Sequence, residues 1–161
     1  MIFIKVTIFS ESSYRPVIED RIGLGGLIYC DNGEGFVISK CVLSADKGFH
    51  AINRAELDFA IYLCNRCKEF ANAELLLVTD NVYILESYDI RYKRVHYTSK
   101  LVPGGYSMFY IAHLLAYYAA DTSCDIEKSF SFSLNPNVAR YQLCDFVENI
   151  ICSGAKNGIF I

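Results

Sequence analysis

The chain has 161 residues, and its 15 lysine and arginine residues are outnumbered by 18 acidic residues, which gives a net charge of −3. Hydrophobic residues make up 53% of the chain and aromatic residues 14%, a composition that excludes an intrinsically disordered protein. The charge balance gives no global sign of a nucleic-acid partner, and no apolar run approaches the roughly 20 residues that cross a membrane. The length fits one domain, which we expect over residues 1–152, followed by a tail over residues 153–161.

The chain begins with a segment that carries a single basic residue, Lys5, and alternates apolar with other side chains. This pattern indicates a strand and not a signal peptide, so we expect a soluble cytoplasmic protein without a membrane partner. The seven cysteines are an odd number, which favours reduced thiols. We also expect a monomer.

The first third of the chain predicts an antiparallel meander of three strands. The polar segment Ser12–Arg21 is predicted to be a loop, and Asp31–Gly35 has the composition of a hairpin turn. The three strands, rich in β-branched and aromatic residues, are Ile2–Ser10, Ile22–Cys30 and Phe36–Ser44.

Two motifs of small residues stand in these first elements and in the helix after them. Gly23, Gly25 and Gly26 leave room for a close backbone approach to the second strand, and a bound RNA strand is one candidate for it. Cys64 and Cys67 form a C-x-x-C pair, but no second pair has the spacing of a zinc ribbon. Packing against the sheet is therefore favoured for the two cysteines.

From residue 53 the hydrophobic period becomes helical, and helices then alternate with strands. The order predicts an α/β fold with a five-stranded mixed sheet, β-β-β-α-β-α-α-β-α, and helices on both faces. Asp89–Gly105 is polar and mixed and is predicted to have no regular structure. The predicted helices are Asn53–Phe70, Asn81–Ser87, Tyr106–Ala120 and Val138–Cys152, and the predicted strands are Glu74–Thr79 and Ile126–Leu134.

Four acidic residues lie where strands end or on helices: Glu11, Glu56, Asp80 and Asp145. Each one alone is typical of a turn, a helix cap or a solvated helix face. If the first and fourth strands are neighbours, however, Glu11 and Asp80 come side by side at one sheet edge. Carboxylates gathered there need compensation, and oxygen ligands suit Mg²⁺ or Mn²⁺, of which a pair about 3.5–4 Å apart promotes phosphodiester hydrolysis.

Four motifs of the chain resemble, in order and spacing, the four blocks of type 1 ribonuclease H. The resemblance covers about residues 3–152 and implies a ribonuclease H-like fold. The motifs are Phe9-Ser-Glu-Ser-Ser13, Asn53-Arg-Ala-Glu-Leu-Asp-Phe-Ala-Ile61, Val78-Thr-Asp-Asn81 and Cys144-Asp145.

The resemblance implies that Glu56, Asp80 and Asp145 ligate two Mg²⁺ or Mn²⁺ ions, with Glu11 in the first ligand position. It implies no organic cofactor. The family has Asp where this chain has Glu11, and a mobile His near the position of Asn135, which we assign to the catalytic set. His50, His96 and His113 lie elsewhere in the sequence. Residues expected to bind the substrate are Ser12, Asn53 and Asn81.

A basic segment over residues 91–100 holds four cations and no acid, although the rest of the chain is acidic. We expect Arg91, Lys93 and Arg94 to contact phosphates of the substrate, with interleaved tyrosines available for stacking. An ordinary solvated loop is the alternative interpretation of this segment.

The leading hypothesis is an endonuclease that uses metal ions to hydrolyse the RNA strand of an RNA–DNA hybrid. A second hypothesis is a catalytically impaired module of the same fold that binds nucleic acid or protein, and Glu11 and Asn135 both motivate it. A third keeps the nuclease chemistry but acts on another nucleic acid, which fold alone does not exclude.

Overall fold

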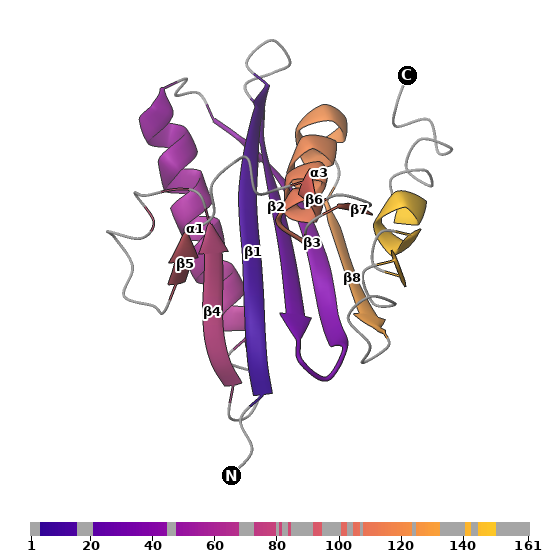
Figure 1. Ribbon diagram of the computed structural model, residues 1–161. Helices are drawn as coiled ribbons and strands as arrows, with labels where there is room; N and C mark the ends of the chain where they lie inside the picture. Colours follow the sequence, from indigo (N-terminus) through magenta and orange to yellow (C-terminus); the bar gives the residue numbers. More distant parts are fainter. Residues whose placement is uncertain are drawn as a thin grey trace.

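The structure is a computed structural model of the whole chain, shown in Figure 1. It has one main sheet flanked by helices. The residues that it describes are 4–15, 21–44, 48–67, 73–79, 81, 84, 92–94, 101–102, 105–106, 108–123, 125–132, 141–142 and 145–150.

The main sheet has six strands in the order β5-β4-β1-β2-β3-β8, and a separate pair of two-residue strands, β6 and β7, forms a second sheet. Neighbours in the main sheet are antiparallel except for β1–β4 and β4–β5, which are parallel. The α/β class and the mixed sheet are thus confirmed. The bounds are β1 (Ile4–Arg15), β2 (Arg21–Cys30), β3 (Glu34–Leu43), β4 (Ala73–Thr79), β5 (Tyr92–Arg94), β6 (Leu101–Val102), β7 (Gly105–Tyr106) and β8 (Ile126–Ser131).

Two long helices cover opposite faces of the sheet, as predicted. Helix α1 (Phe49–Cys67) packs Leu63 and other apolar residues on the face that carries Ile8 of β1. Helix α3 (Met108–Thr122) packs Leu115 on the other face, against Leu27 of β2. Because alternate residues of a strand point to opposite faces, even-numbered residues of β1 face α1 and odd-numbered ones face α3.

Glycines of β2 bring α3 very close to the sheet. A Cβ atom added to Gly25 would lie 2.0 Å from the carbonyl oxygen of Ala112, and one added to Gly23 would lie 1.9 Å from that of Ala116. The close approach expected here is confirmed, but a helix of the same chain makes it, so the suggestion of a bound RNA strand on these two glycines was wrong. Gly26 points to the other face, toward α1.

The cysteines of the C-x-x-C pair pack in the core. Cys64 and Cys67 are fully buried on α1 among the residues of the cluster that faces β1 and β2. The packing interpretation of this motif is therefore confirmed.

The polar segment between the first two strands was predicted to be a loop, and that prediction was wrong at both ends. Strand β1 continues to Arg15, and β2 begins at Arg21. Glu11 pairs with Gly25 across these strands, so it lies inside β1 and not beyond its end. Backbone hydrogen bonds to β2 extend β1 through this segment, because these bonds do not depend on the polar side chains of Ser12 and Ser13. Residues 16–20 lie outside the described residues.

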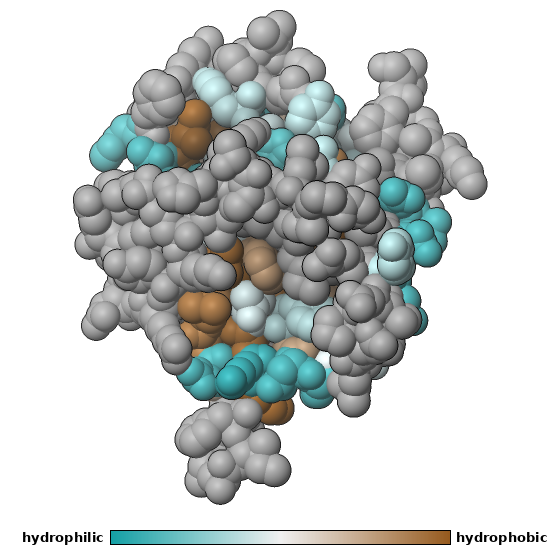
Figure 2. Space-filling view, in the orientation of Figure 1, coloured by the Kyte–Doolittle hydropathy of each residue, from teal (hydrophilic) through white to brown (hydrophobic). Residues whose placement is uncertain are grey.

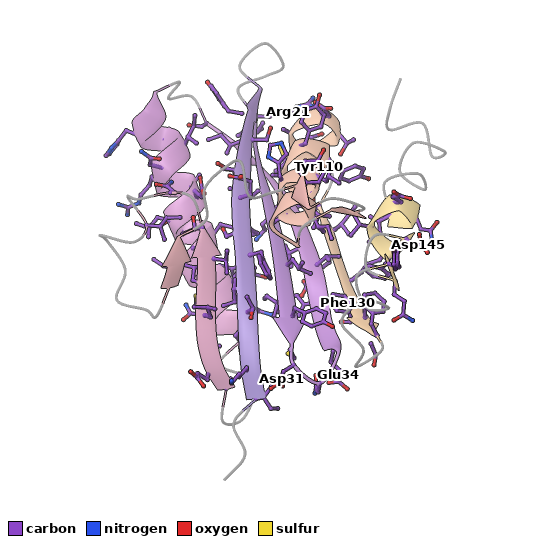
Figure 3. All side chains as sticks on the ribbon, viewed as in Figure 1. Arg21, Asp31, Glu34, Tyr110, Phe130 and Asp145 are labelled. Atoms are coloured by element: carbon purple, nitrogen blue, oxygen red, sulfur yellow. The ribbon has the colours of Figure 1, made fainter. Side chains whose placement is uncertain are left out.

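The turn between β2 and β3 has the predicted position. Gly33 adopts a φ of 88°, and its N–H donates to the carbonyl of Cys30 at 3.0 Å. Figure 2 shows hydrophilic surface along the lower rim of the molecule, the end at which Figure 3 places Asp31 and Glu34. Asp31 N–H also donates to the carbonyl of Lys5, at the opposite end of β1 from Glu11.

Helix α1 begins earlier than its periodicity suggests. It starts at Phe49, and Ala51 N–H donates to the carbonyl of Gly48 at 3.1 Å. Asn53 therefore lies in the second turn and not at the helix start. The residues from Phe49 to Ile52 show only a weak hydrophobic period but are compatible with a helix. The helical hydrogen bonds therefore begin at the carbonyl of Gly48. Residues 68–70 of the predicted helix lie outside the description.

The later elements agree with prediction except in the basic segment. Strand β4, helix α3 and strand β8 are confirmed within a few residues, and residues 141–142 and 145–150 are helical, within the predicted last helix. Strands β5, β6 and β7 lie where no regular structure was predicted. The free edge of β4 offers backbone partners to β5, which a local pattern does not reveal. The predicted helix Asn81–Ser87 falls mostly outside the described residues. No helix in the described part of the chain has the length and apolar character to span a bilayer.

Candidate carboxylate site between β1, α1 and α3

Glu11 is an acidic residue inside the central part of the sheet. It lies on β1 and is only 6% exposed. Its Oε1 accepts a hydrogen bond of 3.1 Å from the backbone N–H of Ser12. As an odd-numbered residue of β1 it stands on the face that α3 covers. Burial of a carboxylate costs free energy unless charge or hydrogen bonds compensate it, so Glu11 marks this place as a candidate site.

Glu56 approaches the next residue of β1, Ser12, from α1 on the other face of the sheet. It is 4% exposed, and its Oε2 accepts a hydrogen bond of 2.7 Å from the hydroxyl of Ser12. Ser12 thus bonds to both acids, to one through its backbone N–H and to the other through its side chain. The sequence predicted Ser12 as a substrate contact, but the structure gives it these two carboxylates as partners.

Two asparagines form a hydrogen-bonded pair on the side of Glu56. The side-chain amide of Asn81 donates to Oδ1 of Asn53 at 3.1 Å, and its backbone N–H donates to the hydroxyl of Thr79 at 3.1 Å. Asn53 lies three residues before Glu56 on α1, and residues at this spacing share one face of a helix. The structure therefore brings the two predicted substrate-binding asparagines together, beside the end of β4.

The neighbouring strands of the predicted site are confirmed. Strands β1 and β4 pair in parallel, with Phe9 opposite Val78. Glu11 follows the first member of this pair by two residues, and Asp80 follows the second by two residues in the sequence. Asp80 itself lies outside the described residues, as do Arg91 and Asn135.

A histidine that sequence reasoning set aside lies next to Glu11. Nδ1 of His113, on α3, is 3.8 Å from Oε2 of Glu11, and the side chain of His113 is 25% exposed. The ring of Tyr110, one turn earlier on α3, stacks with the His113 ring at a centroid distance of 6.0 Å. Figure 3 shows Tyr110 on this helix. The sequence signal for this contact is a match between small residues. Ala112 and Ala116 of α3 pack on Gly23 and Gly25 of β2, and this match predicts the face of the sheet that α3 covers.

The structure does not bring Asp145 to these carboxylates. Asp145 is exposed on the last helix, and Figure 3 shows it at the β8 edge of the sheet, three strands away from β1. The reason is the position of β8, which pairs with β3 and leads the following helix to that edge. Val147 and Ile150 of that helix pack into the cluster that contains Phe130 of β8.

The basic segment is only partly placed. Lys93 and Arg94 belong to β5, where their backbones pair with Val78 and Thr79 at the end of β4. Two of the three cations predicted to contact phosphates thus belong to a strand beside the proposed site. Their side chains are not described.

The donor set fits a hard divalent cation in its chemistry. Two nearly buried carboxylates and side-chain amides supply oxygen atoms, which are the ligands that Mg²⁺ and Mn²⁺ prefer. Within the described ranges, which exclude Asp80, no three His, Cys, Asp or Glu side chains form a group arranged to hold a metal ion. In comparisons with known proteins, no protein-family model matches this chain, and the search of curated proteins found no match.

Proposed function

We propose that the protein is a metal-dependent endonuclease of the ribonuclease H type, with a ribonuclease H-like fold, that hydrolyses the RNA strand of RNA–DNA hybrids. The observation that carries the proposal is that two nearly buried carboxylates, Glu11 of β1 and Glu56 of α1, both accept hydrogen bonds from Ser12, one from its backbone N–H and one from its hydroxyl. The pairing of β1 with β4, which Asp80 follows, supports a third acid beside them. The four sequence motifs point to the same family.

Electrostatics argues for a cation at this place. Burial of an ionised carboxylate costs free energy unless charge or hydrogen bonds compensate it, and Glu11 and Glu56 are both nearly buried. A divalent ion compensates that cost. Glu11, Glu56 and Asp80 would hold it, and when bound it would supply activation of water and stabilisation of the leaving oxygen.

The residues of the chain itself orient the acids and the substrate. Ser12 holds Oε2 of Glu56 and Oε1 of Glu11 in fixed directions. Asn53 and Asn81, joined side by side, offer amide groups to the sugar–phosphate backbone. Lys93 and Arg94 add positive charge on β5, next to the end of β4. Selectivity for a hybrid comes from 2′-hydroxyl contacts and groove shape, because these features distinguish RNA from DNA without reading bases.

The position of Asp145 favours a second candidate, a module that binds hybrid with little turnover. Without Asp145 the site has one carboxylate fewer than the resemblance implies. Loss of an acid weakens metal binding but leaves contacts to the nucleic-acid backbone intact. A module of this kind would bind the hybrid without cleaving it, and the test below distinguishes the two outcomes.

The test is cleavage of an end-labelled RNA–DNA hybrid in Mg²⁺ and in Mn²⁺, with duplex DNA, duplex RNA and single-stranded RNA alongside. We expect hybrid cleavage by the wild-type protein and a loss of about 100-fold or more for Glu56→Gln, since small misplacements at a reacting centre already cost that much. Asp80→Asn should show a similar loss.

Glu148→Gln is the matched control, because Glu148 is an exposed glutamate of the last helix. It should cleave at the wild-type rate. An intact hybrid in both metals that is still bound by the folded wild-type protein would identify the binding module. Equal cleavage by wild type and Glu56→Gln would reject the site.

A further inference from the structure

We propose that Asn32, in the turn between β2 and β3, is a self-modification site that converts to aspartate or isoaspartate when the turn opens, and that the closed turn suppresses this reaction. The turn lies at the opposite end of β1 from Glu11, because Asp31 N–H donates to the carbonyl of Lys5. Figure 3 shows Asp31 and Glu34 at this end of the sheet. The inference is therefore independent of the proposed function.

The sequence supplies the two groups that react. Asn32 is followed by Gly33, which has no side chain to hinder its own backbone nitrogen. That nitrogen loses its proton to solvent and attacks Cγ of Asn32, so that an N–Cγ bond forms. The Cγ–Nδ2 bond breaks, and the amide nitrogen takes a proton from solvent and leaves as ammonia.

Water completes the reaction. It opens the five-membered imide ring at either of the two ring carbonyls, which gives aspartate or isoaspartate. The net change is the uptake of water and the release of ammonia, with no oxidation or reduction. Asn32 is exposed, as are Asp31 and Glu34 beside it, so water reaches the site in the native protein. Burial of the side chain therefore does not protect it.

Two hydrogen bonds of the closed turn hold the reacting groups instead. The N–H of Gly33 donates to the carbonyl of Cys30 at 3.0 Å, so the proton that must leave is already bonded. Oδ1 of Asn32 accepts a bond of 3.0 Å from the backbone N–H of Glu34, which fixes the direction of the side-chain amide.

The backbone around these bonds is also held. Gly33 is buried and has a φ of 88°, and the pairing of β2 with β3 begins at Tyr29 and Gly35 on either side of the turn. Attack by the nitrogen of Gly33 requires the backbone and the amide to rotate toward each other. The reaction therefore proceeds from molecules in which the turn has opened.

Modification changes the turn itself. Either product adds a carboxylate between Asp31 and Glu34, and like charges at this spacing repel each other. Isoaspartate also lengthens the main chain by a methylene group, which alters the geometry by which the N–H of Gly33 reaches the carbonyl of Cys30. Modified molecules should therefore close the turn less well.

The experiment compares the reaction in the native full chain with that in urea, in the same mildly alkaline buffer. Trypsin at mildly acidic pH, where the reaction is slow, releases residues 22–40 as one peptide, and mass spectrometry measures its conversion. We expect conversion in urea to be roughly ten-fold faster or more, since two hydrogen bonds of ordinary net strength correspond to such a factor. Equal rates in both conditions would overturn the proposal.

The same chain offers an internal reference. Asn157 is also followed by a glycine, and in urea it should react at a rate similar to that of Asn32. Conversion of Asn157 but not of Asn32 in urea would contradict the proposal. Asn32→Gln is the matched variant, because its longer side chain disfavours ring closure. It should remove the product from residues 22–40 and keep that of Asn157, and a product that persists in residues 22–40 would reject Asn32 as the site.

A stability measurement tests the effect on the turn. Wild-type protein and Asn32→Gln are aged in urea, refolded and compared with fresh samples of each. Ageing should lower the melting temperature of the wild type more than that of Asn32→Gln. An equal change in both proteins would show that modification of Asn32 does not weaken the turn.

Discussion

At the scale of single residues, Ser12 makes the most specific contribution to the site. A hydrogen bond to a charged group contributes about 1.5–3 kcal/mol, or roughly 10- to 100-fold in an equilibrium, and Ser12 makes two to carboxylates. Only the one from its hydroxyl depends on the side chain. Ser12 is therefore a positioning residue for Glu56.

We expect Ser12→Ala to weaken metal binding by roughly 10-fold while leaving the fold intact, because only the bond to Glu56 is lost. Ser12→Thr keeps the hydroxyl and should restore most of the affinity. Ser13→Ala, one residue further along β1, is the control and should have no effect. The measurement is the metal-induced shift in melting temperature, and equal shifts for Ser12→Ala and wild type would contradict the role.

Cys30 illustrates the effect of burial on a titratable group. Burial first, and then the negative charges of Glu34 and Asp31, raise the pKa of the Cys30 thiol from 9.0 to about 11. The folded protein therefore keeps this thiol protonated between pH 9 and pH 11, whereas the unfolded chain ionises it. The contribution of Cys30 to the stability of the fold is complete below pH 9 and is lost as the pH rises through this window.

The raised pKa predicts slow chemistry at Cys30. In native protein at pH 8, iodoacetamide should label Cys30 much more slowly than Cys41, which is partly exposed, because the thiolate is the reactive form. Mass spectrometry of the labelled peptides measures both rates. Similar labelling after unfolding in urea is the control, and equal rates in the native protein would contradict the burial of Cys30.

At the scale of secondary-structure elements, the contact between β2 and α3 leaves no room for an added side chain at Gly25. A Cβ at Gly25 would meet the backbone of α3 at 2.0 Å, whereas one at Gly26 would meet side-chain carbons of Leu63 and Phe59 at 2.8–3.2 Å. Backbone atoms of a packed helix move only with the whole helix, while side chains shift by changing rotamer.

Gly25→Ala should therefore destabilise the protein by about 3 kcal/mol or more, at the upper end of the range for overpacking. Gly26→Ala should cost clearly less, since its neighbours can adjust. Urea unfolding of both variants measures the difference. A Gly25→Ala protein as stable as Gly26→Ala would show that α3 does not lie on this face.

The elements were predictable to different degrees. Periodicity identified the three-stranded meander, α1, β4, α3 and β8, because each buries a regular set of apolar residues. It missed the extension of β1 through the serines, since backbone pairing with β2 supplies those hydrogen bonds. It missed β5 for the same reason, since the partner of Tyr92–Arg94 is the edge of β4.

At the scale of the whole molecule, the sheet order determines which parts of the site meet. The sequence analysis made the adjacency of the first and fourth strands a condition of the site, and the pairing of β1 with β4 meets it. Glu11 and Glu56 were both identified from the sequence. The approach of His113 was not predicted, because it depends on which face α3 covers. Placement of Asp145 near Glu11 was not observed, because β8 pairs with β3 and leads the last helix to the outer edge.

The packing of α3 on Gly23 and Gly25 of β2 also affects how the protein folds during synthesis on the ribosome. The meander emerges first, but the alanines of α3 are synthesised roughly 90 residues after Gly25, which is about 4 to 20 seconds at typical rates of translation. During that interval one side of the nascent sheet has no helix to cover Leu27 and Val37. This interval is the one in which a chaperone would have to shield the growing chain.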